Sequence, residues 1–196
     1  MQKLEKKLNK ESFKFLKELV KSWQYSWKDI KEKVNIENWG IIWKWNLNIR
    51  RTKVKKVKAK RIEWNLNIEW VESLEEIEVE EIWWDLYIEE TKVKKVKVKK
   101  IGWYLDAFWL KSLEEIEVEE EIGWYLDISW TKIKKIKAKR IRWYIDAEWA
   151  KNLEDIEIEK EIGWNLDINR TKIDFQKKIL EKIKKWELKV SWKVVF

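Results

Sequence analysis

The feature of this sequence that most constrains its fold is an internal repeat of about twenty residues. Seven five-residue segments, each beginning with tryptophan, fall into register: WNLNI (45–49), WNLNI (64–68), WDLYI (84–88), WYLDA (103–107), WYLDI (124–128), WYIDA (143–147) and WNLDI (164–168). Their starts are 19, 20, 19, 21, 19 and 21 residues apart. A unit this short cannot bury its apolar face alone, so we expect the copies to stack into a solenoid.

Within each segment apolar and polar residues alternate, which is the pattern of a strand with one buried face. In the first copy, Trp45, Leu47 and Ile49 should point inward. Carried through all copies, this alternation predicts a column of tryptophans inside the core: Trp45, Trp64, Trp84, Trp103, Trp124, Trp143 and Trp164.

The rest of each copy differs between odd and even copies. Odd copies continue with the lysine-rich segments 52–62, 91–101 and 131–141, and even copies with the glutamate-rich segments 73–82, 112–122 and 152–162. Adjacent strands lie about 4.8 Å apart, so each row of lysines should lie between rows of glutamates. Apolar residues such as Val57 and Ile77 predict a second strand that closes the core. We interpret the alternation as a ladder that fixes register rather than as a nucleic-acid site.

We expect one domain, with a helical N-terminal cap (1–41), the repeat solenoid (42–173) and a C-terminal cap (174–196), because an open stack needs covered ends. Segment 12–23 has helical spacing, with apolar residues that include Trp23, and Ser26 with Asp29 forms a capping-box pattern over 26–34. At the other end, a helix should begin at Asp174 and a last strand should lie within 187–196.

A family resemblance appears in the run Leu126, Ile128, Thr131, Ile133, which fits the leucine-rich-repeat pattern LxLxxNxL with threonine in the asparagine position. The run recurs at 47–54, 86–93 and 166–173. Residues 42 to 173 thus resemble the short repeats of bacterial and phage proteins. The chain departs from that pattern by lacking proline, by its tryptophans and by even copies without the threonine. The resemblance implies recognition of a macromolecule on the strand face.

The expected fold is therefore mainly β: a parallel β-solenoid, or leucine-rich-repeat-like stack, of about seven coils. The N-terminal cap should be α-helical and the C-terminal cap a helix plus a strand. Curvature, as an arc or a straight solenoid, stays open at this point.

Several function classes are excluded or disfavoured by composition. The chain has no cysteine and no histidine, which removes thiolate chemistry and the commonest metal ligand and general base. We therefore expect no enzyme, no cofactor, no metal and no small-molecule substrate. No apolar run approaches the roughly 18 residues of a membrane span, and the N-terminus lacks a signal-peptide pattern. We expect a cytoplasmic protein without a membrane partner.

The outward face of the first strand is the candidate binding surface. Its residues are Tyr87, Tyr104, Asp106, Phe108, Tyr125, Asp127, Tyr144, Asp146, Glu148 and Asp167. The aspartates stack like charges on neighbouring coils, which disfavours folding. Rigid aromatics beside carboxylates suit a protein interface. The sequence thus predicts a module that docks a basic protein surface, for example a phage or mobile-element inhibitor of a nucleic-acid-binding enzyme. The simpler interpretation is a solvated sheet face.

Two other functions stay open. The net charge of +8 is concentrated at the two ends, so nucleic acid could bind the C-terminal pole through Lys177, Lys178, Lys182, Lys184 and Lys185. The regular charge alternation also fits an engineered or structural repeat with no partner, although the irregular caps oppose it. A second tryptophan set, Trp70, Trp109, Trp130 and Trp149, predicts a partly exposed rim, because Arg51, Glu90 and Arg170 hold the same position in other copies.

Overall fold

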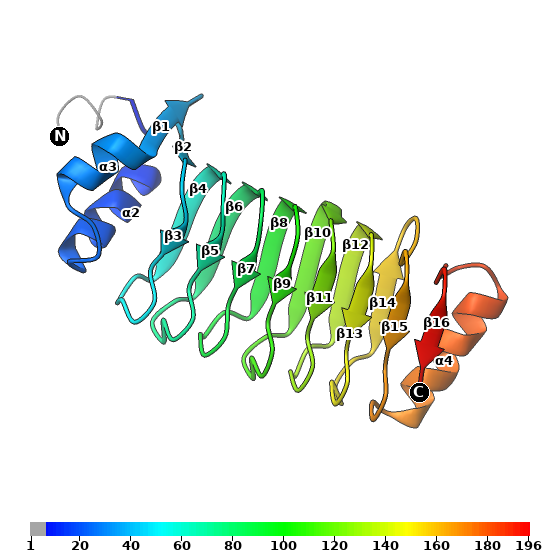
Figure 1. Ribbon diagram of the computed structural model, residues 1–196. Helices are drawn as coiled ribbons and strands as arrows, with labels where there is room; N and C mark the ends of the chain where they lie inside the picture. The colour runs from blue at the N-terminus through cyan, green and yellow to red at the C-terminus, as the bar shows by residue number, and fades with distance from the viewer. Residues whose placement is uncertain (1–6) are drawn as a thin grey trace.

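The repeats form a parallel β-solenoid of about six turns with helices at both ends (Figure 1). The computed structural model describes residues 7–196. Each of the first six repeats contributes a short strand and a long strand, and the seventh contributes a short strand only. Together with strands of the two caps, each kind of strand builds its own sheet of eight strands. The prediction of a mainly β, short-repeat solenoid is confirmed.

The two sheets lie on opposite sides of one core. The long-strand sheet contains β1 (Val34–Glu37), β2 (Gly40–Trp43), β4 (Lys56–Ile62), β6 (Glu76–Ile82), β8 (Lys95–Ile101), β10 (Glu115–Ile122), β12 (Lys135–Ile141) and β14 (Asp155–Ile158). The short-strand sheet contains β3 (Leu47–Asn48), β5 (Leu66–Asn67), β7 (Leu86–Tyr87), β9 (Leu105–Asp106), β11 (Tyr125–Asp127), β13 (Tyr144–Asp146), β15 (Asn165–Asp167) and β16 (Lys193–Val195).

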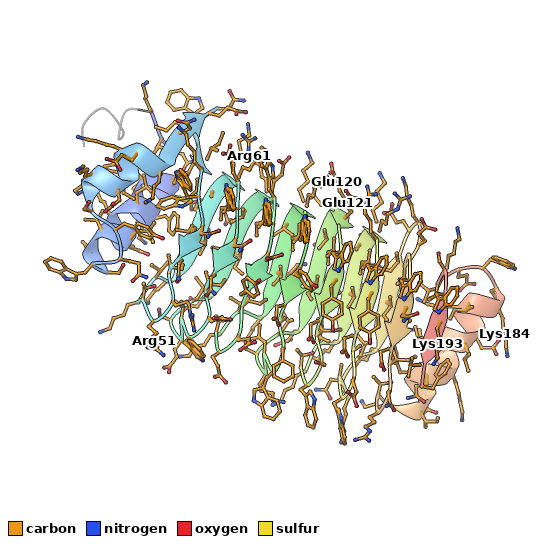
Figure 2. The ribbon with its side chains drawn as sticks, in the orientation of Figure 1. Arg51, Arg61, Glu120, Glu121, Lys184 and Lys193 are labelled. Carbon is orange, nitrogen blue, oxygen red and sulfur yellow. The ribbon has the colours of Figure 1, made fainter. Side chains whose placement is uncertain are left out.

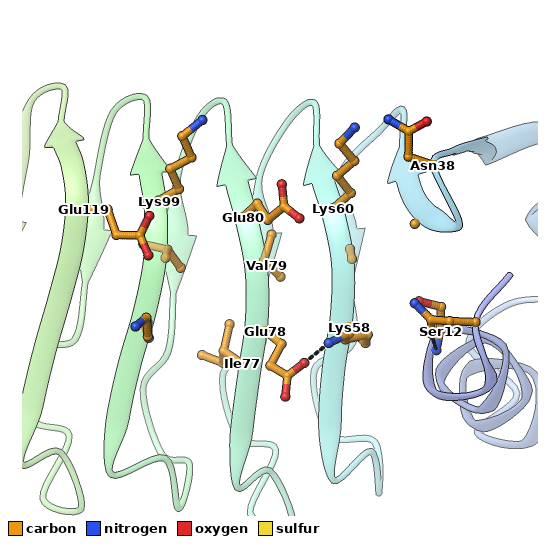
Figure 3. Close-up of a pocket in the computed structure, with 15 residues that line it drawn as sticks. Ser12, Asn38, Lys58, Lys60, Ile77, Glu78, Val79, Glu80, Lys99 and Glu119 are labelled. Carbon is orange, nitrogen blue, oxygen red and sulfur yellow. Dashed lines mark hydrogen bonds and ion pairs between the residues drawn. The ribbon is translucent and has the colours of Figure 1, made fainter.

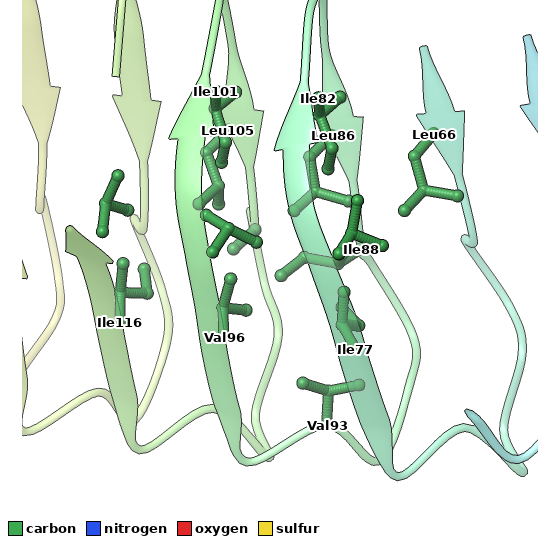
Figure 4. Close-up of a cluster of buried hydrophobic side chains, with 14 of the residues drawn as sticks. Leu66, Ile77, Ile82, Leu86, Ile88, Val93, Val96, Ile101, Leu105 and Ile116 are labelled. Carbon is green, nitrogen blue, oxygen red and sulfur yellow. The ribbon is translucent and has the colours of Figure 1, made fainter. Parts of the chain in front are cut away.

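Aliphatic side chains from both sheets fill the core (Figure 4). Ile82 and Ile101 on long strands and Leu86 and Leu105 on short strands are all fully buried. Buried methylene groups each contribute about 0.8 kcal/mol, so these stacked aliphatic columns are the main source of stability. The inward positions predicted for the second strand, such as Val57 and Ile77, are buried as expected.

The charge ladder occurs on the long-strand sheet in the predicted register. Lys56 lies opposite Glu76 and Lys58 opposite Glu78, and Lys56 Nζ is 2.8 Å from Glu76 Oε2. Further along, Lys135 is paired in register with Glu115 in the preceding coil and with Asp155 in the following coil. The register shifts after Val118 in β10, where one extra residue is accommodated as a bulge. This insertion explains why that repeat is longer.

The prediction that the first tryptophan of each repeat lies inside the core is wrong. Six of the seven, from Trp45 to Trp143, are 38% to 56% exposed, and Trp164 is half-buried. The reason is that the short strands begin after the tryptophan, so Trp64 lies in the bend that follows β4 rather than in β5. Alternation along an extended backbone does not fix the direction of a side chain in a bend.

The N-terminal cap contains two helices and a hairpin. Helix α2 (Lys10–Lys21) begins two residues earlier than the predicted segment 12–23. It follows Asn9, whose side chain accepts a hydrogen bond from the Ser12 amide. Helix α3 (Trp27–Lys33) has the predicted capping box of Ser26 and Asp29. Trp23 was expected on the apolar helical face, but it follows the end of α2 and is 95% exposed. The antiparallel hairpin β1–β2 was not predicted.

The C-terminal cap replaces the long strand of the last repeat. Helix α4 (Ile173–Lys184) begins one residue before the predicted position, Asp174. Strand β16 then pairs in parallel with β15 and extends the short-strand sheet. Within residues 7–196, no helix is both long enough and apolar enough to cross a membrane.

Candidate functional site

The predicted site residues lie together on the outer side of the short-strand sheet, which we call the strand face. Asp127 is paired in register with Asp106 on one side and with Asp146 on the other, and Asp146 is paired with Asp167. Tyr87 lies opposite Asp106 in the neighbouring strand. The predicted aspartate column is therefore present.

A tyrosine column runs beside the aspartates. The ring centroids of Tyr104 and Tyr125 are 5.4 Å apart, and those of Tyr125 and Tyr144 are 5.0 Å apart. Phe108 lies in the turn after β9 and is 39% exposed. Glu148 lies in the equivalent turn, 3.8 Å from the guanidinium of Arg170. The aromatic part of the predicted site is thus continuous over the central coils.

Each aspartate of the column holds the turn that follows its strand. The Oδ1 atoms of Asp106, Asp127, Asp146 and Asp167 accept hydrogen bonds of 2.8–3.0 Å from the backbone amides two residues further on. Asn48 and Asn67 make the same bond in the first two coils. The turn therefore needs an acceptor but not a charge. This structural role was missed by the sequence reasoning, although an aspartate two residues before a turn could have indicated it.

The tyrosine hydroxyls donate to the carboxylates of the following coil. Tyr125 donates to Asp146 at 3.2 Å and Tyr144 to Asp167 at 3.3 Å, both at Oδ2. Tyr87 donates within its own coil to Asp85 at 3.0 Å. These bonds hold the tyrosine rings in fixed orientations, so a partner would meet a surface that is already ordered.

Several carboxyl groups of the strand face have raised pKa values. Burial raises the pKa of Asp127 to about 6, and the charges of Asp146 and Asp106 act in the same direction against the hydrogen bonds from Ser129. Burial also raises the pKa of Glu89 to about 6, again assisted by neighbouring carboxylates. Burial is also the main cause of the raised pKa of Asp106. The face therefore holds negative charge at an energetic cost.

Tryptophans border the strand face at both ends of its strands. The first border, the tryptophan ladder, is a stack of Trp64, Trp84, Trp103, Trp124, Trp143, Trp164 and Trp192 with ring centroids 4.8–5.8 Å apart. The second, the tryptophan rim, comprises Trp70, Trp109, Trp130 and Trp149, of which the last three stack on one another. The prediction of a partly exposed rim is confirmed, whereas the ladder was missed as a surface feature.

The predicted basic pole is partly neutralised. Lys178 and Lys182 lie 3.3 Å and 2.6 Å from Asp155 Oδ1, and Lys184 lies 3.0 Å from Glu181. Within residues 7–196, Lys177 and Lys185 have no ion-pair partner. Figure 2 shows Lys184 and Lys193 near this end of the molecule. The pole thus offers fewer free cations than its sequence indicates.

The long-strand sheet carries an open hollow of about 720 Å³ beside α2 (Figure 3). Its lining includes Lys58, Glu78, Lys99 and Glu119. Lys58 and Glu78 pair with each other, as the dashed line in Figure 3 shows. Among the described residues, no three acidic, histidine or cysteine side chains are grouped to hold a metal ion. The hollow therefore belongs to the charge ladder.

No known protein family matches this chain, and neither a curated protein nor a solved structure matches it.

Proposed function

We propose that this protein is a binding module that docks a basic surface of another protein on its strand face. The observation that carries the proposal is the choice of aspartate at Asp106, Asp127 and Asp146. Asn48 and Asn67 make the same turn bond without a charge. The later coils instead stack like charges in register, which costs stability. A partner that neutralises these charges gives a reason for keeping them.

The aromatic content of the strand face supports a protein partner. Tyr104, Tyr125 and Tyr144 form a rigid column between two tryptophan borders, and Phe108 and Trp109 add exposed apolar surface. Tyrosine and tryptophan are enriched among the residues that dominate binding energy at interfaces. Exposed apolar patches rimmed by polar groups commonly mark such sites.

The charge of the face supports a basic partner. Carboxylates with raised pKa values gain most from a nearby cation, because the cation offsets both burial and mutual repulsion. Asp127 and Glu89, with pKa values raised to about 6, are the groups that should respond most strongly. Arginine and lysine side chains from a partner could each approach two carboxylates of adjacent coils.

The buried threonines of the repeat bear on the family and role of this protein. The threonines in the asparagine position, such as Thr131 and Thr171, are buried and donate to backbone carbonyls at 2.7 Å and 2.6 Å. This use of the position supports a leucine-rich-repeat-like identity, and with it recognition on the strand face. One role that suits an acidic face is inhibition of a nucleic-acid-binding enzyme, as in a phage or mobile-element inhibitor.

The test compares wild type with the triple variant Asp106→Asn/Asp127→Asn/Asp146→Asn. Asparagine keeps the turn bond, as Asn48 and Asn67 show, whereas lysine would remove the acceptor and disturb the fold. The matched control is Glu80→Gln/Glu119→Gln/Glu159→Gln, which removes the same charge from exposed positions on the long-strand side. Each protein is used to capture partners from bacterial lysate, with and without nuclease, and captured proteins are identified by mass spectrometry.

We expect one partner protein to be captured by wild type and equally by the glutamate control variant, also after nuclease treatment. The aspartate variant should not capture it. Its affinity should fall at least tenfold, since charge pairs at interfaces are worth about 1.5 kcal/mol or more each. Equal capture by both variants would refute the proposal. Capture that depends on nucleic acid and is lost in Lys177→Glu/Lys185→Glu would move the function to the basic pole.

A further inference from the structure

A second surface adjoins the strand face and follows the turns that lead from the short strands to the long strands. Two residues after each rim position comes one exposed side chain per coil. In order these are Lys53, Glu72, Lys92, Lys111, Lys132, Lys151 and Lys172. We call the last five the rim lysines. They occupy five consecutive coils, whereas the adjoining long-strand sheet alternates lysine with glutamate.

The rim lysines are not neutralised by the protein. Within residues 7–196 none of them lies within 4.0 Å of a carboxylate oxygen, although many ladder lysines do. Burial lowers the pKa of Lys111, and the charge of Lys132 acts in the same direction. Neighbouring coils are about 4.8 Å apart, so this row repels itself and lacks the alternation that stabilises the ladder.

The tryptophan rim lies directly against these lysines. Lys111 Nζ is 3.9 Å from the ring centroid of Trp109, and Lys151 Nζ is 4.7 Å from that of Trp149. The guanidinium of Arg170 covers Trp149 at 4.8 Å and continues the stack. Lys111 also donates to the backbone carbonyl of Trp130 at 2.6 Å. Partly exposed indoles and the lysines without an ion-pair partner therefore share one ridge.

The backbone at the rim is strained. Trp109, Trp130 and Trp149 have φ values of 59°, 59° and 61°, in the left-handed region that residues other than glycine seldom adopt. Arg51 and Glu90 hold the same position in other coils, so the fold does not require an aromatic ring there.

The shape of the ridge favours a flat partner. The turns line up in a row along one margin of the elongated molecule (Figure 1), and Arg51 in Figure 2 marks the first of them. The ring faces of Trp130 are covered by its neighbours at 5.3 Å and 4.7 Å, so nucleobases cannot stack on them. What remains accessible is a line of indole edges and ammonium groups.

We infer that this ridge binds an anionic lipid surface. Indoles favour the boundary between lipid headgroups and hydrocarbon, and lysines are attracted by acidic headgroups. Together they give the two kinds of interaction that peripheral attachment needs. This inference replaces the expectation of no membrane partner. That expectation rested on the lack of a spanning segment, which has no bearing on attachment through surface side chains.

The experiment is co-sedimentation of the full chain with vesicles of phosphatidylcholine containing phosphatidylserine, and with vesicles of phosphatidylcholine alone. The first variant is Lys111→Glu/Lys151→Glu, for which Glu72 shows that an even coil accepts glutamate. The control is Lys177→Glu/Lys185→Glu, which makes the same charge change at the C-terminal pole. Circular dichroism melting checks that each variant is folded.

Wild type should bind the phosphatidylserine vesicles and not the neutral ones. Lys111→Glu/Lys151→Glu should bind at least about 25-fold more weakly, since each lysine near such a surface is worth about a factor of five. The control should stay within twofold of wild type. Equal binding by the ridge variant, equal loss in the control, or no binding to either vesicle would overturn the inference.

A second variant tests the indoles. Trp109→Arg/Trp149→Arg copies Arg51 and Arg170 from other coils and keeps the ridge basic. Its binding to phosphatidylserine vesicles should become fully sensitive to high salt, because only screened charge attraction remains. Salt resistance equal to wild type would overturn the role of the indoles. Loss of polynucleotide binding in Lys111→Glu/Lys151→Glu, without any vesicle binding by wild type, would instead identify a nucleic-acid site. The two lysine variants leave the strand face unchanged, so their failure leaves the proposed function untouched. Trp109→Arg/Trp149→Arg alters the border of the strand face and is therefore used for the vesicle test alone.

Discussion

Asp127 accepts two hydrogen bonds from Ser129, one from its backbone amide at 2.8 Å and one from its hydroxyl at 2.6 Å. These bonds hold the turn after β11, yet burial and neighbouring carboxylates still raise the pKa of Asp127 to about 6. The residue is therefore needed as an acceptor and disfavoured as an anion. This conflict between geometry and charge gives the first prediction.

Asp127→Asn should stabilise the protein at pH 7. The pKa of this carboxyl is about 6 in the folded protein and near 3.8 in the unfolded chain. The protonated group therefore contributes stability at low pH, and that contribution is lost as the pH rises from about 4 through 6. Asparagine keeps the amide bond without the charge, so the gain at pH 7 should be about 1 kcal/mol after allowing for solvent screening. Urea unfolding at pH 7 and pH 4.5 measures it. A variant that is less stable than wild type at pH 7 would contradict this account.

The stabilisation that the charge ladder provides should be lost in acid. The pKa of Glu117 is lowered first by its hydrogen bond with Lys95, and that of Glu121 by its hydrogen bond with Arg142. Groups with lowered pKa values contribute stability above their unfolded pKa, and this is lost as pH falls through the lower, folded value. We expect the melting temperature to drop steeply below about pH 4, in wild type and in Asp127→Asn alike. A level melting temperature from pH 7 to pH 3 would show that the ladder contributes nothing.

Gly123→Ala should destabilise the coil stack. A Cβ atom at this position would lie 1.8 Å from the carbonyl oxygen of Gly102 in the preceding coil, so the backbone would have to move. Overpacking of this kind costs about 1–3 kcal/mol. Arg142→Ala is the control, because the equivalent corner there already carries a side chain. It should cost less than about 1 kcal/mol, mostly from the lost pair with Glu121. Equal effects in thermal unfolding would argue against close backbone contact at the corner.

Glu90→Gly should be more stable than Glu90→Ala. Glu90 is exposed and has a φ of 49°, a conformation that glycine adopts without strain and alanine does not. The difference between the two variants should be about 1 kcal/mol in favour of glycine. Chemical denaturation of both variants in parallel measures it. The opposite order would mean that this turn is not held in the left-handed conformation.

Part of the strand face could be predicted from the sequence. The columns of Asp106, Asp127 and Asp146 follow directly from repeat register, since equal positions in stacked coils become neighbours. The turn bonds made by these carboxylates could not be predicted from alternation, because they depend on the geometry of the backbone after the strand. The partial neutralisation of Lys178 and Lys182 by Asp155 depends on how α4 packs against the last coil, which no local pattern encodes.

By itself the sequence determined that the chain stacks, which residues of the strands face inward, and that lysine rows meet glutamate rows. A repeat of about twenty residues combined with a period of two leaves one register for the strands. Only the tertiary structure decided where the tryptophans lie. Trp64 precedes the two-residue strand Leu66–Asn67 and sits in a bend, where alternation has no force and stacking on Trp84 orients the ring. The rim residues likewise take their direction from a left-handed turn. The aromatic borders and the lysine ridge therefore depend on the bends and turns between strands, whose side-chain directions cannot be predicted from the alternation of apolar and polar residues.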